Sequence, residues 1–130
     1  MMGAKKGKKT MKFHVLGVMS GTSLDGLDLA SAQFRKDRNG QWHFDFTLTE
    51  TIPYPKAWQK RLARAHKLNK KKLEKLDFEY TKWLSKTLYQ SIKKYDLMDI
   101  EAICSHGHTV LHQPEKGITL QIGNLPFISN

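Results

Sequence analysis

Residues 17–28, GVMSGTSLDGLD, place three glycines, two serines, a threonine and two aspartates within twelve positions. A glycine-rich turn exposes backbone N–H groups, which together with hydroxyl side chains can cradle phosphate oxygens. Glycine also lets a phosphate approach the backbone closely. Asp25 and Asp28 could hold a hydrated Mg²⁺, a cation that takes a few carboxylates and keeps several waters. The segment therefore contains the parts of a nucleotide-phosphate site.

The same residue types dominate ordinary hairpin turns, so the segment by itself leaves a plain turn and a ligand-binding turn equally open. Two familiar nucleotide motifs are excluded. No Gly-Lys-Ser/Thr follows at the spacing of a Walker A loop. A strand rather than a helix is predicted after the turn, which argues against a dinucleotide-binding fingerprint.

A second group of chemistry-bearing residues is His106, His108 and His112, with Cys104 shortly before them. Imidazole and thiolate are common zinc ligands, and a structural zinc site takes four ligands. The His-x-His-x3-His spacing matches no strong metal signature, so zinc binding is the weaker hypothesis. The favoured interpretation is that His106 and His112 form hydrogen bonds within a loop.

Three strands are predicted around the glycine-rich segment. Residues 13–19 are rich in β-branched and large apolar types, and residues 26–34 and 42–48 alternate apolar and polar side chains. Asp37 to Gly40, DRNG, carries an Asn-Gly hairpin signal between the second and third strands. We therefore expect the chain to open with a three-stranded antiparallel meander, whose first turn is the glycine-rich segment.

Two helices are predicted after the meander. The first runs from about Lys56 to Lys67, and the second from about Lys71 to Tyr95. In the longer helix apolar residues recur near every 3.6 positions, which makes an amphipathic stripe that we interpret as core packing. The residues of that stripe are Leu73, Leu76, Tyr80, Leu84, Leu88, Ile92 and Tyr95.

Short strands are predicted near the end of the chain, at residues 100–104, 110–111 and 118–122, with residues 105–109 forming a loop. Three strands followed by helices and further strands indicate an α/β fold with a mixed sheet. The last residues, LPFISN, carry no helix stop and no closing element. We therefore expect an incomplete fold.

The composition of the 130 residues is that of one globular domain, with 39% hydrophobic and 26% charged residues. The single cysteine, Cys104, excludes an internal disulfide framework and is typical of a reducing compartment. No apolar run approaches the roughly 20 residues that a membrane span needs. We expect a cytoplasmic protein with no membrane partner.

The net charge of +10 gathers in residues 1–12 and in residues 56–75. A basic balance favours anionic partners such as nucleic acid or phosphate ligands. The favoured interpretation is a solvated tail and a solvated helix face. Nucleic-acid binding is the alternative, and it is disfavoured because no aromatic stacking platform interleaves with the lysines.

The glycine-rich segment and two later segments resemble the signature motifs of anhydro-N-acetylmuramic acid kinases. Gly17 to Asp28 is similar to the first motif, and Ser105 to Val110, followed by His112 to Pro114, is similar to the second. Thr119 to Asn124 is similar to the third. All three occur in the family's order and spacing, and the resemblance covers roughly residues 13–124.

The resemblance implies a place among sugar kinases, actin and heat-shock ATPases, in which two ribonuclease-H-like lobes surround a nucleotide cleft. It implies an enzyme that uses ATP and Mg²⁺ to phosphorylate O6 of 1,6-anhydro-N-acetylmuramic acid. The anhydro ring opens in the same reaction, which yields N-acetylmuramic acid 6-phosphate for murein recycling. A homodimer is compatible with a full-length protein of this kind.

The resemblance also implies which residues face the ligands. Asp25 is the expected Mg²⁺ ligand within the ATP-phosphate loop. Many members of the family have Gln where this chain has His108. The implied ATP-binding residues are Gly21, Thr22, Ser23, Leu24, Asp25, Gly26, Leu27 and Asp28, and the implied sugar-side residues are His106, Gly107, His108 and Thr109.

No catalytic residue is implied within this chain. The family's catalytic base is an Asp in a Gly-Asp-Phe-Arg segment downstream of the third motif, and no such segment occurs up to Asn130. We interpret residues 13–130 as a partial N-terminal actin-like ATPase lobe and residues 1–12 as a basic disordered tail. Because phosphoryl transfer depends on several parts, we expect negligible turnover from these residues alone, with a non-catalytic remnant as an alternative.

Overall fold

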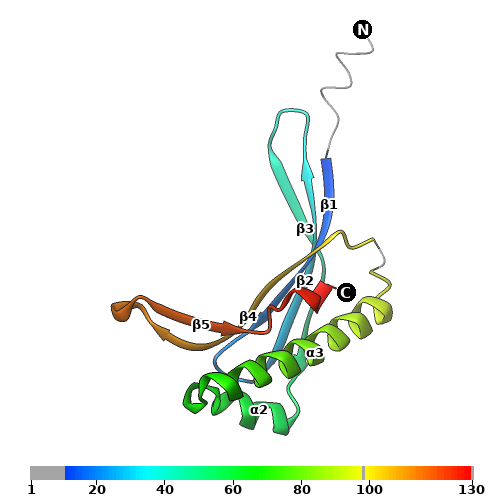
Figure 1. The fold of residues 1–130 in the computed structure, drawn as a ribbon. Coiled ribbons are helices and arrows are strands. Elements are labelled where there is room, and N and C mark those ends of the chain that lie inside the picture. Colours follow the sequence, from blue (N-terminus) through cyan, green and yellow to red (C-terminus); the bar gives the residue numbers. More distant parts are fainter. Residues whose placement is uncertain (1–10, 98, 130) are drawn as a thin grey trace.

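The computed structural model describes residues 11–97 and 99–129. Five strands of the described residues form one mixed sheet in the order β3-β2-β1-β4-β5, and two helices pack on one face of it (Figure 1). The elements are β1 (Met11–Ser20), β2 (Gly26–Lys36), β3 (Trp42–Pro53), α2 (Lys56–Ala63), α3 (Lys70–Lys94), β4 (Ala102–Gln113) and β5 (Ile118–Ile122), with short 3₁₀ helices at Ala65–Lys67, Pro114–Lys116 and Pro126–Ser129.

The predicted meander is confirmed, because β1 pairs antiparallel with β2 and β2 pairs antiparallel with β3. At the DRNG turn the N–H of Gly40 donates to the carbonyl oxygen of Asp37 at 3.1 Å, and Gly40 has a φ of +83°. The chain then forms the two helices, and β4, which follows them, lies parallel to β1. This mixed α/β arrangement is consistent with part of a ribonuclease-H-like, actin-type ATPase lobe.

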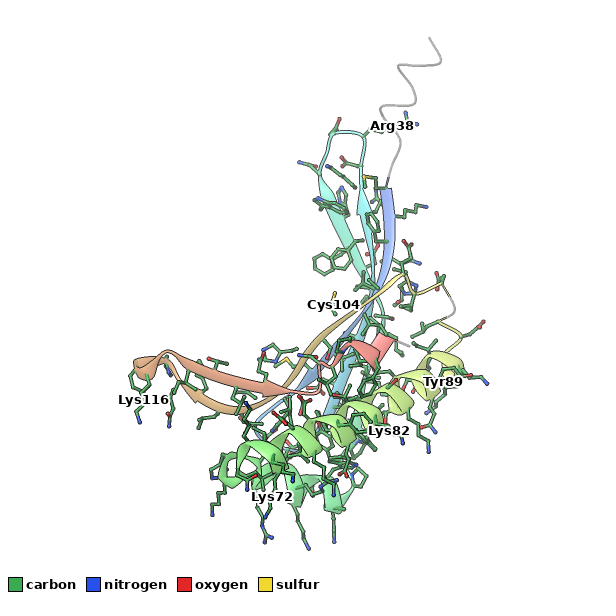
Figure 2. All side chains as sticks on the ribbon, viewed as in Figure 1. Arg38, Lys72, Lys82, Tyr89, Cys104 and Lys116 are labelled. Carbon is green, nitrogen blue, oxygen red and sulfur yellow. The ribbon has the colours of Figure 1, made fainter. Side chains whose placement is uncertain are left out.

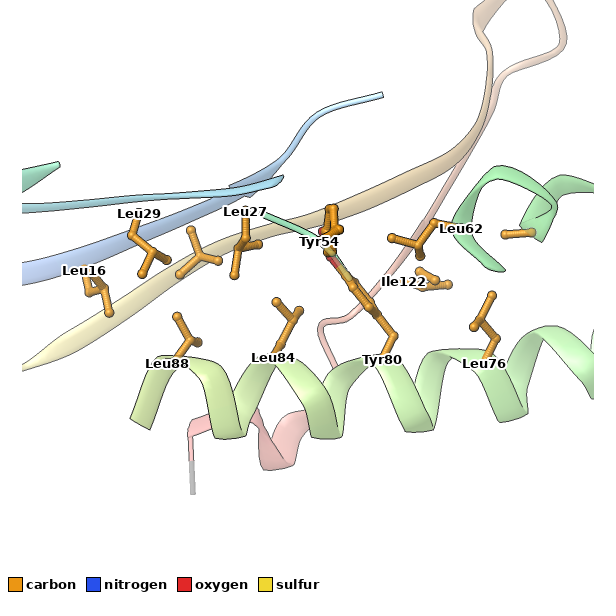
Figure 3. Packing of buried hydrophobic residues seen from close by; sticks show 12 residues of the cluster. Leu16, Leu27, Leu29, Tyr54, Leu62, Leu76, Tyr80, Leu84, Leu88 and Ile122 are labelled. Atoms are coloured by element: carbon orange, nitrogen blue, oxygen red, sulfur yellow. The ribbon is translucent and has the colours of Figure 1, made fainter. Parts of the chain in front are cut away.

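α3 begins after Asn69, whose side-chain oxygen accepts the backbone N–H of Lys72 at 2.9 Å and caps the first turn. Its predicted apolar stripe is confirmed from Leu73 to Ile92 and faces β1 and β2, with Tyr54 and Tyr80 lying against each other (Figure 3). Tyr95, the last predicted member, lies beyond the end of α3 and outside this cluster. No helix of the described residues is both long and apolar enough to cross a bilayer. The buried cluster contains Leu16, Val18, Leu27, Leu29, Tyr54, Leu62, Ala65, Leu76, Tyr80, Leu84, Leu88 and Ile122.

Residues 105–109 lie in the middle of β4, so the prediction of a loop there is wrong, as is the prediction of two separate strands around it. Gly107 has a φ of +73°, and between the pairs Val18–Ser105 and Ser20–His108 two residues of β4 oppose one of β1. This is a β-bulge, which inserts a residue without ending the strand. The extra residue interrupts the alternation of side chains along the strand. Together with the glycine, this interruption makes the sequence resemble that of a loop.

Several predicted boundaries also move, and β2 and β3 continue to Lys36 and Pro53 rather than ending at residues 34 and 48. α2 ends at Ala63 rather than near residue 67, although Ala65 is still buried because a 3₁₀ turn continues the helix. Met11 and Lys12, which were predicted to belong to the tail, form the start of β1. The predicted tail otherwise lies outside the described residues.

The face of the sheet opposite α3 carries exposed aromatic side chains around a floor of small residues. Two hollows of about 820 and 640 Å³ lie along this face, and Gly17, Ala30 and Cys104 line both of them. Apolar surface of this kind is typical of an interaction surface. Its aromatic side chains, which are 36–64% exposed, are Phe13, Phe34, Trp42, Phe44 and Phe46.

Candidate functional site

The glycine-rich segment forms the turn between β1 and β2. The N–H of Leu24 donates to the carbonyl oxygen of Gly21 at 3.2 Å, and Leu24 adopts a φ of +60°, which is uncommon for a residue with a branched side chain. Thr22, Ser23 and Asp25 are exposed. Within the described part of the chain, the backbone N–H groups of these three residues donate to no backbone acceptor. The turn therefore presents hydroxyls, N–H groups and a carboxylate to solvent.

The segment between β3 and α2 holds this turn in place. The N–H of Tyr54 donates to the carbonyl oxygen of Asp25 at 3.3 Å. The side-chain amide of Gln59, on α2, donates to the carbonyl oxygen of Leu24 at 3.0 Å. Both hydrogen bonds are donated to backbone carbonyl oxygens of the turn by residues of this neighbouring segment. The solvent-exposed side of the turn therefore remains available to a ligand.

Gly26, at the start of β2, packs directly on β3. A Cβ atom at this position would lie 2.5 Å from the carbonyl oxygen of Ile52, so no larger residue fits without a backbone shift. Two positions further on, Asp28 is exposed on the opposite face of the sheet from α3, and its Oδ1 accepts the hydroxyl of Thr51 at 2.6 Å. Leu27, between them, is buried and faces the core, so it cannot contact a phosphate with its side chain.

The structure brings all three sequence motifs together at the end of β1. Ser20, directly before the turn, pairs with His108 of β4, and His108 pairs with Ile122 of β5. Beyond β5, the N–H of Gly123 donates to Oδ1 of Asp77 on α3 at 2.7 Å. Segments about 85 and 100 positions from the turn therefore lie beside it.

A chain of buried hydroxyl groups and one imidazole connects α3 to the turn. Tyr54 donates its hydroxyl hydrogen to Ser20 Oγ at 2.6 Å, and Ser20 Oγ lies 2.8 Å from His108 Nδ1. The hydroxyls of Tyr54 and Tyr80 lie 2.5 Å apart. Burial lowers the pKa of His108 and raises the pKa of both tyrosines, because apolar surroundings disfavour the charged forms. The four groups are therefore neutral at pH 7.

This buried imidazole predicts a loss of stability in mild acid. The pKa of His108 is lower in the folded protein than its ordinary value of about 6.5, so its stabilising effect is complete above that pH and is lost as the pH falls through the folded value. We expect the free energy of unfolding to fall between about pH 7.5 and about pH 5.5, by at most about 1.4 kcal/mol per pH unit from this group. Ser20, Tyr54 and Tyr80, which surround it, do not titrate in this range.

Urea denaturation of the wild-type chain and of His108→Gln at both pH values would measure this effect. The other histidines are present in both proteins, so the difference between the two pH dependences isolates His108. Equal pH dependence would contradict the assignment.

The four predicted sugar-side residues fall into two groups. His106 is exposed and Thr109 is half-buried, and the side-chain amide of Gln121 on β5 lies 3.3 Å from His106 Nε2 and 3.4 Å from Thr109 Oγ1. Gly107 and His108 are buried. Only His106 and Thr109 thus present side chains that a ligand could contact directly.

The histidines do not gather into a metal site. His108 bonds to Ser20, His112 lies 2.9 Å from the hydroxyl of Thr119, and His106 contacts Gln121 across the strands rather than within a loop. Among the described residues there is no group of three or more His, Cys, Asp or Glu side chains that could hold a metal. The exposed carboxylates near the turn do suit Mg²⁺, which needs only one or two carboxylates when phosphate oxygens and waters complete its shell.

The basic residues of the segment 56–75 project outward from α2 and α3 (Figure 2). Arg61 pairs with Glu79, and its guanidinium carbon lies 4.6 Å from the centre of the Trp58 ring. Every lysine and arginine in this range is exposed. Nucleic-acid binding by this surface stays a hypothesis.

Sequence reasoning missed Ser20 and Tyr54, and it interpreted Tyr80 only as core packing. The signal that could have pointed to Tyr80 is its place in a stripe of leucines, because a buried tyrosine hydroxyl usually needs a partner. Nothing local could have paired Ser20 with His108, since they are 88 positions apart.

The family model described as "Anhydro-N-acetylmuramic acid kinase" matches residues 13–130. Proteins of that name from Acaryochloris marina and Hydrogenovibrio crunogenus are 36% and 34% identical to the chain, over 90% and 88% of its length. The one from Mannheimia succiniciproducens is 32% identical over 92%. The chain spans about a third of the length of these curated relatives, 31–32%.

Proposed function

Because the chain belongs to the anhydro-N-acetylmuramic acid kinase family, we propose that it supplies the ATP-phosphate lobe of a sugar kinase. The proposed reaction transfers the γ-phosphoryl group of ATP to O6 of 1,6-anhydro-N-acetylmuramic acid while water adds to C1 and the C1–O6 bond breaks. The product is N-acetylmuramic acid 6-phosphate. Such a recycling enzyme would work in the cytoplasm.

The observation that carries the proposal is the meeting of the three motifs beside one exposed turn. Ser20, His108 and Ile122 lie in one row across β1, β4 and β5, although they belong to segments far apart in the chain. A ligand bound at the turn would also lie close to His106 and Thr109 on β4.

In the proposed site the turn binds the phosphates. The N–H groups of Thr22, Ser23 and Asp25 and the two hydroxyls face solvent and can donate to phosphate oxygens. Asp25, and Asp28 as held by Thr51, would serve as carboxylate ligands of Mg²⁺. When bound, Mg²⁺ neutralises phosphate charge. Phosphoryl transfer gains most from this positioning and charge stabilisation.

On the sugar side we propose His106 and Thr109 as contacts, with Gln121 orienting both side chains. His108 and Gly107 are buried, so they would support the site without contacting the sugar. The proposal assigns no group of this chain to activate the water that attacks C1. We therefore expect binding of MgATP without measurable turnover from these 130 residues.

Calorimetry with MgATP tests the proposal. We expect weak binding by the wild-type chain and a loss of about tenfold or more in affinity for Asp25→Ala, because a carboxylate ligand of the metal is removed. Asp45→Ala is the matched control, since Asp45 is an exposed acid on β3, away from the turn, and its loss changes the net charge equally. Equal affinity of Asp25→Ala and wild type would remove Asp25 from the site. Absence of heat with the wild-type chain would contradict a phosphate site in this lobe.

A further inference from the structure

Tyr54 forms hydrogen bonds with both ends of the glycine-rich turn. Its hydroxyl donates to Ser20, the residue directly before the turn, at 2.6 Å, and its backbone N–H donates to the carbonyl oxygen of Asp25, near the end of the turn, at 3.3 Å. Tyr54 itself is 5% exposed and packs against Tyr80 and Trp83, with ring centres 6.3 and 5.4 Å away. Tyr54, which lies within the buried cluster beside Tyr80 (Figure 3), thus links both ends of the turn to the core.

One arrangement of hydrogens lets every hydroxyl of this series donate to its neighbour. Tyr54 donates to Ser20 Oγ, and in this arrangement the hydroxyl hydrogen of Ser20 donates to Nδ1 of His108, which is then unprotonated. The hydroxyl of Tyr80 then donates to that of Tyr54. Neutral His108 with its hydrogen on Nε2 is the tautomer that this order requires.

Each link is buried, so none can be replaced by water without disturbing the core. Ser20 is 4% exposed, His108 3% and Tyr80 0%. A buried polar group that loses its partner destabilises the structure by more than an average hydrogen bond contributes. His108 therefore determines where Ser20 points, and Ser20 and Tyr54 together determine where the turn begins and ends.

We propose that His108, Ser20 and Tyr54 are positioning residues of the phosphate loop, which they hold in its binding conformation before nucleotide arrives. This inference rests on the proposed function for the link to nucleotide, but its structural part can be tested without it. None of the three needs to touch a phosphate. Their contribution is preorganisation, which raises affinity because the ligand does not have to order the loop.

Two variants separate positioning from simple core packing. In His108→Gln the side-chain amide oxygen can still accept the hydroxyl of Ser20, whereas in His108→Leu the site is filled but has no acceptor. His112→Leu is the control, because His112 is an exposed histidine of the same strand that bonds only across to Thr119.

Hydrogen exchange in the nucleotide-free chain provides the first measurement. The reporters of the turn are the amides of Leu24 and Tyr54, which donate to Gly21 and Asp25, and the amide of Leu84 in α3 reports global opening. We expect His108→Leu to accelerate exchange of the two turn amides about tenfold beyond any change at Leu84, as for one lost buried hydrogen bond. His108→Gln should restore them to about twofold of wild type, and His112→Leu should leave them unchanged.

MgATP affinity of the same variants provides the second measurement. His108→Leu should bind several-fold more weakly than wild type, and His108→Gln should recover most of the loss. Turn amides that change only in step with Leu84, or that fail to recover in His108→Gln, would overturn the positioning role. If the turn amides respond as expected while the wild-type chain binds no MgATP, the proposed function fails and the positioning role stands.

Discussion

Gly107→Ala is expected to lower the free energy of unfolding by about 3–5 kcal/mol. The φ of +73° at this position is unfavourable for any residue with a Cβ. The new Cβ would also lie 2.5 Å from the carbonyl oxygen of Ile122 and 2.7 Å from the side-chain nitrogen of Asn124. Because the carbonyl belongs to the β4–β5 ladder, it cannot move without disturbing the pairing. Urea denaturation followed by circular dichroism would measure the loss.

Gly117→Ala is the matched control for this prediction. Gly117 has a similar φ, +66°, but a Cβ there would meet no atom within 4 Å. It should lose only the backbone contribution, about 1–2 kcal/mol. The difference between the two variants measures how tightly the bulge packs on β5. Equal losses would show that the close approach at Gly107 does not exist.

Tyr80→Ala is expected to destabilise the chain by about 4 kcal/mol, because it empties the centre of the core. Tyr80 is fully buried, and its ring lies 5.5 Å from that of Trp58 and 6.2 Å from that of Trp83. Its hydroxyl also begins the hydrogen-bonded chain that ends at His108. Thermal and urea unfolding of the variant would give the loss directly.

Two further variants separate the contributions to this loss of stability. Tyr80→Phe keeps the ring and removes only the hydroxyl, so we expect a loss of about 1–1.5 kcal/mol. Tyr89→Ala removes the same residue type from the same helix where it is 61% exposed, and its contact with Lys93 is worth less than about 1 kcal/mol. A loss in Tyr89→Ala as large as that in Tyr80→Ala would mean that α3 does not pack on the sheet through the face described here.

Elements bounded by strong local signals were predictable from sequence. β5 has the predicted limits, Ile118–Ile122, because Gly117 and Gly123 on either side adopt φ values of +66° and +95° that interrupt a strand. α3 begins and ends within one residue of its prediction, since its stripe and its Asn69 cap are both local. β4 was not predicted as one strand because the bulge at Gly107 is stabilised by its two neighbours in the sheet, which local sequence does not identify.

The candidate site was predictable only in its exposed half. The residue types between Gly21 and Asp28 indicated a turn able to bind phosphate, since that capacity depends on backbone freedom and short polar side chains that are adjacent in sequence. The half that supports the turn was not predictable. Tyr54 lies in a proline-flanked segment with no motif, and Tyr80 occupies a position where any large apolar residue would fit the stripe.

The sequence by itself therefore determined the order of the elements, the turn and the family of this protein. Each of these depends on residues close together in the chain, or on motifs matched one at a time. Tertiary structure alone decided that β4 lies parallel to β1, that Ser20 meets His108, and that Tyr54 spans the turn. The physical reason is that strand register and buried hydrogen bonds across 88 positions follow from packing the whole sheet against α3, where each contact is favourable only if the others form.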